Sequence, residues 1–255
     1  MITPIISAEK IEQLREAILL HNNIVITSHV SPDGDAIGSS LGLYHYLRKL
    51  NKQVTVVLPD MVPRNLHFLA GMRYVVFYTQ QPEKACEAIA QADMIFSLDY
   101  NALHRVDKLS GAISASNAYK VLIDHHLDPE DFPNLTISHP EISSTCELIF
   151  RVIWQLGHYR MMPRSSAEAI YTGMMTDTGN FTYNSNQPEI YNIVALLVKK
   201  HIDKDQIYNL VCNTQTANKL MLNSYAICNK MELFPEYGAA MIYLTREEMT
   251  SYSFQ

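Results

Sequence analysis

Two short segments of this chain concentrate side chains that bind metal ions and activate water. They are His29-Val30-Ser31-Pro32-Asp33-Gly34-Asp35 and Asp124-His125-His126. Each follows a run of branched apolar residues, Ile24–Ile26 or Val121–Ile123, and is therefore expected on a loop after a buried strand. The carboxyl ends of parallel strands share one edge of a sheet, where functional groups gather. The sequence thus predicts a metal centre shared by the two segments.

Two further aspartates are expected at the same edge. Asp99 follows the apolar run Met94–Leu98, and Asp177 follows a predicted helix that ends near Met175. If the strands are neighbours, six candidate metal ligands converge: His29, Asp33, Asp35, Asp99, His125 and Asp177. Carboxylates and imidazoles without thiolates suit Mn²⁺, and Mg²⁺, Fe²⁺ or Co²⁺ less specifically, and four carboxylates balance two divalent ions. We expect Asp99 to bridge the two ions.

A pair of divalent ions about 3.5–4 Å apart activates water and stabilises charge on the attacking and leaving oxygens of a phosphoryl group. Phosphoester hydrolysis is therefore the predicted reaction. Each ligand taken singly also has a structural interpretation: the Asp-Gly pair at 33–34 is a common turn sequence, Asp35 has the form of a helix N-cap, and Asp99 and Asp177 fit the ends of a strand and a helix. We interpret Gly34 as a residue whose dihedral freedom aims both neighbouring aspartates into one site. The joint pattern, and no single residue, favours metal binding.

The apolar pattern predicts the elements that carry these residues. Helical spacing covers 9–20, 36–50, 166–175 and 188–200, with a further helix around 85–90. Strands are predicted at Ile24–Thr27, Val54–Leu58, Tyr74–Phe77, Met94–Leu98 and Tyr119–Ile123. This alternation predicts an α/β fold with a mostly parallel, doubly wound sheet.

The second half of the chain is expected to be mainly helical. The string Ser144-Thr145-Cys146-Glu147 has the form of a capping box and should begin a helix. Helical character is expected to continue to about Glu232. After Pro235 the pattern changes, and a strand at Ala239–Leu244 resembles the start of a smaller, incomplete carboxyl-terminal domain.

Composition restricts the class of protein. Hydrophobic residues make up 47% of the chain, enough for a substantial core, and the four cysteines are too widely spaced to suggest a zinc site or a redox pair. No apolar run approaches the roughly 20 residues that span a bilayer, and no signal sequence is recognisable. We therefore expect a cytoplasmic protein without membrane contact. The net charge of −6 argues against a footprint on duplex nucleic acid but permits a short anionic substrate, since bound metal ions supply positive charge locally.

Five strings in the chain resemble, in order and spacing, the successive motifs of the DHH phosphoesterase superfamily. They are residues 29–39, Leu98-Asp99 with Arg105, Asp124-His125-His126, Ser144-Thr145 and residues 176–181. The likeness is greatest to the NrnA-like branch, nano-RNases that also hydrolyse 3′-phosphoadenosine 5′-phosphate (pAp), and it covers about residues 5 to 250. Cyclic-dinucleotide phosphodiesterases are near relatives of this branch.

The resemblance implies a two-domain enzyme that holds two Mn²⁺ ions between a DHH domain and a smaller domain that grips the nucleotide. Its implied substrates are short single-stranded oligonucleotides and nucleotides. Carried over to this sequence, the first ion has three ligands, His29, Asp33 and Asp99. The second has four, Asp35, Asp99, His125 and Asp177.

The resemblance also implies roles outside the ligand set. Asp99 and His126 are the implied catalytic residues, with His126 facing the substrate phosphate. Arg105 matches a family position and is a candidate for a phosphate contact or a structural role. Asp124 is expected to orient His125 without binding metal itself.

The resemblance is incomplete at the carboxyl end. The family's second domain normally carries a glycine-rich string ending in histidine, and this chain has none. We therefore expect a DHH catalytic domain at 1–187, a helical connector at 188–235 and, at 236–255, the start of a truncated substrate-binding domain. Whether the chain is a fragment, and whether it forms a homodimer, is left open.

Three alternatives to hydrolysis of oligonucleotides and pAp stay open. Polyphosphate or pyrophosphate hydrolysis and cyclic-dinucleotide hydrolysis require the same metal ions on the same scaffold. A non-catalytic nucleotide-binding module is the alternative from another class. The complete set of six ligand positions argues against such a module, since a binder needs neither a bridging carboxylate nor an activated water.

Overall fold

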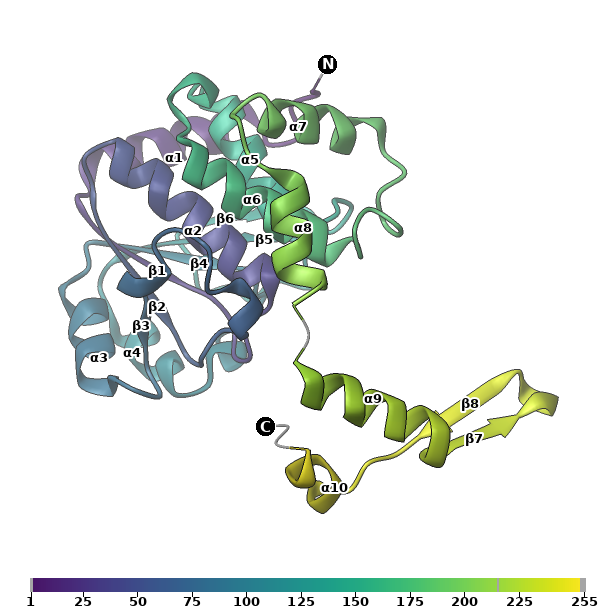
Figure 1. Ribbon diagram of the computed structural model, residues 1–255. Coiled ribbons are helices and arrows are strands. Elements are labelled where there is room, and N and C mark those ends of the chain that lie inside the picture. Colours follow the sequence, from purple (N-terminus) through teal and green to yellow (C-terminus); the bar gives the residue numbers. More distant parts are fainter. Residues whose placement is uncertain (1, 215, 253–255) are drawn as a thin grey trace. The chain divides into compact units, whose positions relative to one another are not determined.

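The computed structural model describes residues 2–214 and 216–252 (Figure 1). Contacts between Cα atoms divide the chain into two units, Met1–Tyr208 and Asn209–Gln255. The sequence placed its boundaries at 187/188 and 235/236, whereas the contacts place a single boundary at 208/209. None of the described helices is both long enough and apolar enough to cross a lipid bilayer.

The first unit is built on a six-stranded sheet with the strand order β3-β2-β1-β4-β5-β6. The strands are β1 (Asn23–Thr27), β2 (Gln53–Leu58), β3 (Val76–Phe77), β4 (Met94–Leu98), β5 (Tyr119–Asp124) and β6 (Leu135–Ser138). All five pairings are parallel. The chain winds outward from β1 in one direction and from β4 in the other, so the predicted doubly wound parallel sheet is confirmed. In such sheets the crevice at the carboxyl ends of the two central strands is where ligands bind.

Helices cover both faces of this sheet (Figure 1). One face packs against α3 (Pro82–Gln91) and α4 (Ser110–Ala115), through a core that includes Val25, Ile95 and Ile113. The opposite face contacts α2 (Gly34–Lys49) and α5 (Thr145–Gln155). The remaining helices are α1 (Ala8–Leu20), α6 (Arg164–Asp177), α7 (Pro188–Val198) and α8 (Lys204–Cys212), which crosses the boundary between the units. Because β4 is covered on both faces, all five of its residues are buried, which explains its uninterrupted apolar sequence.

The sequence missed one strand and misplaced some element ends. Strand β6 lies at the sheet edge and buries only alternate residues, so Leu135 and Ile137 alone gave too weak an apolar signal. Tyr74 belongs to a 3₁₀ turn, and β3 begins only at Val76. Helix α6 continues two residues beyond the predicted end and includes Asp177.

The predicted capping box at the start of α5 forms only in part. The Ser144 side chain accepts a hydrogen bond from the Glu147 backbone N–H, as an N-cap does. The Glu147 carboxylate, however, accepts hydrogen bonds from the backbone and hydroxyl of Ser143 instead of from Ser144 N–H. It also pairs with Arg151 at 2.8 Å, one turn along the same helix. This buried pair fixes the rotamer of Glu147 and turns its carboxylate away from the box position.

Glycines bring α2 against α6 where the sequence analysis gave them other roles. Gly34 is the first residue of α2 and has no left-handed φ; a side chain there would overlap Thr176 of α6. A Cβ at Gly38 would lie 2.7 Å from the Ala169 carbonyl oxygen, so this residue permits close approach to a helix and not to the sheet. The interpretation of Gly34 as a residue of unusual dihedral angles is therefore wrong. Its function is to leave room for a neighbouring helix.

We predict that Gly173→Ala destabilises the first unit. The added methyl group would collide with the Cys146 sulfur and lie 3.0 Å from Asp35 Oδ1, and overpacking of this kind costs about 1–3 kcal/mol. Urea denaturation should show this loss in the free energy of unfolding. Gly111→Ala in α4 is the matched control, because no atom lies within 4 Å of its Cβ, and it should be neutral or slightly stabilising. Equal effects of the two substitutions would contradict the packing argument.

The second unit contains α9 (Ala217–Lys230), an antiparallel hairpin of β7 (Met231–Phe234) and β8 (Ala239–Ile242), and α10 (Arg246–Ser251). The strand predicted near 239–244 is confirmed, whereas the predicted helical stretch ends at Lys230, two residues early. Helix α9 packs against both strands (Figure 1), but it buries only Leu222 and Ala226 among the described residues.

Candidate metal centre

The six predicted ligands lie together at the carboxyl edge of β1, β4 and β5. They form two overlapping groups of donor atoms, each within 4.8 Å of one another. The first group is His29, Asp33 and Asp99. The second is Asp35, His125 and Asp177. These are the two ligand sets that the resemblance implied, apart from the shared position of Asp99 in the second set.

Asp99 lies between the two groups. Its Oδ2 is 3.4 Å from His29 Nε2, and its Oδ1 is 3.7 Å from His125 Nε2. The backbone of Asp99 has a φ of +62°, a left-handed conformation that aspartate and asparagine adopt more readily than most residues. This turn directly after β4 points one carboxylate at both groups. The geometry is that required of a bridging ligand.

Two other ligands are held by local hydrogen bonds. His29 Nδ1 donates to the Val30 carbonyl oxygen at 2.7 Å, which leaves Nε2 as the available acceptor facing Asp99. Asp33 is the N-cap of α2 and accepts from Asp35 N–H at 2.9 Å through Oδ1. The cap predicted at Asp35 is therefore made two residues earlier, and Asp35 itself lies in the first turn of the helix.

The amino terminus of α5 supports both buried carboxylates. Asp35 accepts hydrogen bonds from the backbone N–H groups of Thr145 at 2.7 Å and Cys146 at 2.9 Å. The Thr145 hydroxyl donates to Asp99 Oδ1 at 2.9 Å. Such donors and the positive end of the helix dipole favour carboxylates at this position. Sequence analysis quoted the Ser144-Thr145 string but assigned it no role; the helix start after a serine cap was the signal for this support.

The electrostatics of the ligand set fit a site for divalent cations. Burial, together with the charges of Asp99 and Asp177, raises the pKa of the Asp35 carboxyl well above its usual range. Burial acts in the same direction on Asp99, but the contact and charge of His29 outweigh it and lower the pKa. Four carboxylates so close together repel one another, and bound cations remove that cost. A donor set of carboxylate oxygens and imidazole nitrogens without sulfur is suited to Mn²⁺ or a similar ion.

We predict that metal affinity falls in acid. In the metal-free protein, burial raises the pKa of Asp177 to about 6, and charge from Asp99 adds to the shift. The pKa of His29 is raised as well, because its contact with Asp99 outweighs its burial. Both groups must lose a proton to bind metal, so the association constant should fall at least about tenfold per pH unit below pH 6. Electron paramagnetic resonance of free Mn²⁺ between pH 5 and 8 measures this, and a flat profile would contradict it.

The two histidines after β5 have different partners from those predicted. Asp124 is fully buried, and its Oδ1 accepts a hydrogen bond from His126 Nδ1 at 2.7 Å. The prediction that Asp124 orients His125 is therefore wrong, because alternation along the strand end brings the residue two positions later back to the same side. His125 instead faces Asp35, Asp99 and Asp177 through Nε2.

His126 and Arg105 lie at the border of the ligand set. The hydrogen bond to Asp124 raises the pKa of His126, and the nearby positive charge of Arg105 acts against it. Arg105 belongs to a 3₁₀ segment (Leu103–Leu109), and its carbonyl oxygen accepts from Val30 N–H at 2.8 Å. Its backbone thus supports the loop of His29, and its guanidinium adds positive charge near His126. Both of the roles left open for Arg105 fit this position.

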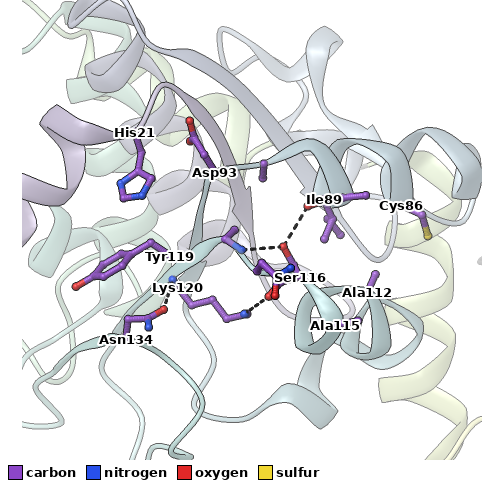
Figure 2. Close-up of a pocket in the computed structure, with 14 residues that line it drawn as sticks. His21, Cys86, Ile89, Asp93, Ala112, Ala115, Ser116, Tyr119, Lys120 and Asn134 are labelled. Atoms are coloured by element: carbon purple, nitrogen blue, oxygen red, sulfur yellow. Dashed lines mark hydrogen bonds between the residues drawn. The ribbon is translucent and has the colours of Figure 1, made fainter.

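The largest cavity in the first unit lies elsewhere. Its volume is about 940 Å³, and its lining includes His21, Asp93 and Tyr119, which precede β1, β4 and β5. Figure 2 shows that the walls are formed largely by small side chains, with the Lys120 ammonium hydrogen-bonded to the Ser116 carbonyl. The candidate ligands follow the same strands, so this cavity is at the opposite edge of the sheet from the metal centre. Size alone does not identify the reactive site.

The fold and the ordered aspartate and histidine motifs define a member of the DHH family. The family model "DHH family, N-terminal domain" matches residues 23–174, and the chain belongs to this family. The match begins at β1 and ends in α6, so it includes five of the six candidate ligands and stops three residues before Asp177.

Several characterised relatives are similar to the chain. It is 30% identical over 191 residues to the bifunctional oligoribonuclease and PAP phosphatase NrnA of Thermus thermophilus, covering 74% of this chain and 54% of that protein. The protein of the same name from Bacillus subtilis is 23% identical, with 94% and 72% coverage. Cyclic-di-AMP phosphodiesterase PdeA of Listeria monocytogenes is 29% identical, with 67% and 27% coverage. The chain thus spans about half the length of the Thermus relative.

A crystal structure of an exopolyphosphatase-related protein from Bacteroides fragilis is also similar. It is 47% identical, with a TM-score of 0.97, and the match covers 100% of this chain and 74% of that one. Its fold agrees with that of the present chain.

Proposed function

We propose that this protein is a metal-dependent phosphoesterase that hydrolyses short oligonucleotides and pAp, with Mn²⁺ as the preferred ion. The observation that carries the proposal is the position of Asp99, whose two oxygens face His29 on one side and His125 on the other. A carboxylate shared by two ligand groups is required for two-ion phosphoryl chemistry and has no purpose in a simple nucleotide binder. The names of the NrnA relatives support the substrate class.

The residues of the site divide the work of hydrolysis. When bound, divalent ions would supply an activated water and offset charge on the phosphoryl oxygens. Asp35 and Asp99 are held by α5 before any ion arrives, so the ligand geometry is fixed in advance. His126 is oriented by Asp124 through Nδ1, and its raised pKa favours the imidazolium. Its Nε2–H is then available to donate to a phosphoryl or leaving-group oxygen.

Polyphosphate hydrolysis is a second candidate because the 47% identical structure is named as exopolyphosphatase-related. The two functions differ in the group attached to the reacting phosphorus and not in the metal centre.

An activity panel with added Mn²⁺ tests the two candidates. It should contain pAp, a diribonucleotide, a pentaribonucleotide, cyclic di-AMP, pyrophosphate and a short polyphosphate. Turnover of the first three at rates at least tenfold above the others is the expected result. Preference for polyphosphate would transfer the proposal to the second function, and metal binding without turnover of any substrate would refute both.

A further inference from the structure

A second hollow in the first unit, of about 560 Å³, lies between the carboxyl-terminal half of α2 and the loop that joins β2 to β3. Its polar lining residues are Tyr44, His45 and Arg48 from α2 and His67, Arg73 and Tyr74 from the loop. We call it the α2 pocket. None of the six candidate metal ligands lines it.

The α2 pocket is positively charged in a chain that is acidic as a whole. Two guanidinium groups, those of Arg48 and Arg73, belong to its lining, and no carboxylate does. The carboxylate that acts on His45 is Glu168 of α6, and it is already paired with Arg164 at 2.7 Å. With a net charge of −6 spread over the rest of the chain, this local excess of positive charge favours an anionic ligand.

Aromatic rings accompany the guanidinium groups. The Arg73 guanidinium carbon lies 4.7 Å from the centre of the Tyr74 ring, and 57% of Tyr74 is exposed to solvent. Tyr44 is half-buried, with its ring edge-on to that of His45 at 5.1 Å. Rings with accessible faces stack on nucleobases, and guanidinium groups bind phosphates through paired N–H donors. The two features together match the two ends of a nucleotide.

The loop wall of the pocket is fixed to α2. His45 Nε2 donates to the Ala70 carbonyl oxygen at 2.8 Å, beside Gly71, whose φ is +92°. His67 Nε2 donates in the same way to the Val62 carbonyl oxygen at 2.9 Å. Both imidazoles therefore hold the loop in place and leave recognition of an anion to the arginines. A fixed wall reduces the entropy lost when a ligand binds.

The pocket is connected to the metal centre through the same two elements. Helix α2 begins at the ligand Asp35, and Tyr44 follows nine residues later, about 14 Å along the helix axis. The loop begins near Asp60, whose carboxylate accepts from Ser31 N–H at 2.9 Å, within the first ligand segment. A short nucleic acid strand with one phosphate at the metal centre is long enough to bring another nucleotide to this distance.

We propose that the α2 pocket binds a nucleotide, with its phosphate at Arg48 and Arg73 and its base against the tyrosine rings. The nucleotide is either the far end of an oligonucleotide substrate, a reading that rests on the proposed function, or a free mononucleotide. Both sources present the same phosphate and base to the pocket.

Histidine side-chain NMR signals test the binding without any catalysis. In metal-free protein, AMP should shift the signals of His45 and His67 more than those of His125, and adenosine should shift them far less. The double variant R48Q/R73Q should weaken AMP binding at least tenfold, whereas R160Q, an exposed arginine outside the pocket, should leave it unchanged. AMP that leaves both pocket signals unmoved, or that binds the double variant as well as the wild type, would overturn the proposal.

Substrate length then distinguishes the two sources. If the pocket holds the far end of an oligonucleotide, R48Q/R73Q should raise KM for a pentaribonucleotide at least tenfold more than KM for a diribonucleotide. Equal effects on both lengths, together with loss of AMP binding, would assign the pocket to a free nucleotide. Because the NMR measurement needs no turnover, failure of the proposed hydrolysis and failure of this pocket are separable.

Discussion

Replacing Asp99 with asparagine will lower kcat for the preferred phosphoester by at least about a thousandfold. The substitution removes the charge that both ligand groups share while keeping the size of the side chain. Asparagine also adopts the left-handed backbone that Asp99 requires, so the variant should fold normally. Loss of the attraction to His29 is offset by relief of the repulsion toward Asp35, and the metal-free variant should keep a melting temperature close to that of the wild type.

The control for this variant is Asp107→Asn. Asp107 also has a positive φ, of 44°, and is exposed in the next segment of the chain, outside the ligand groups. Steady-state kinetics and a Mn²⁺ titration on both variants separate a role in the metal centre from a role in the backbone. Wild-type turnover by the Asp99 variant would show that this residue only caps the end of β4.

Replacing His126 with alanine will reduce kcat about a hundredfold to a thousandfold and leave Mn²⁺ affinity nearly unchanged. His126 already uses Nδ1 to donate to Asp124, so its loss removes the group that faces substrate and not a donor on which the six ligands depend. The expected signature is lower kcat with a normal metal titration. Weaker metal binding in this variant would instead place His126 among the ligands.

A neighbouring histidine provides the matched control for the His126 variant. His139 follows β6 at the same edge of the sheet and is paired with Glu141 at 2.8 Å. His139→Ala should retain both turnover and metal binding. Asp124→Asn adds a finer test, since an amide that turns its NH₂ group toward His126 no longer accepts from Nδ1, and the pH profile of kcat should shift to lower values as the imidazole pKa falls.

The sequence was informative where one physical cause dominates the pattern. Buried parallel strands require continuous apolar runs, and this made β1, β4 and β5 recognisable together with the edge at which their loops meet. The convergence of the six candidate ligands followed from that arrangement. Strand β6 escaped because an edge strand buries every second residue and leaves little signal in four residues.

Side-chain partners and helix contacts were harder to predict because they depend on positions far apart in the chain. The hydrogen bond from Thr145 to Asp99 joins residues 46 positions apart, and no local pattern specifies it. The packing role of Gly34 depends in the same way on Thr176 in α6. The partner of Asp124 was missed for a different reason, since the orientation of successive residues at a strand end decides between His125 and His126.

The contacts between α5 and the two buried carboxylates have a consequence for how the centre is loaded. Asp35 and Asp99 already receive three hydrogen bonds from Thr145 and Cys146 in the absence of any ion. Their rotamers are therefore set during folding, and an arriving cation meets ligands whose conformational entropy has been lost beforehand. Loading resembles the filling of a rigid crown ether. One ion should replace another, or be removed by a chelator and returned, without any cycle of unfolding and refolding.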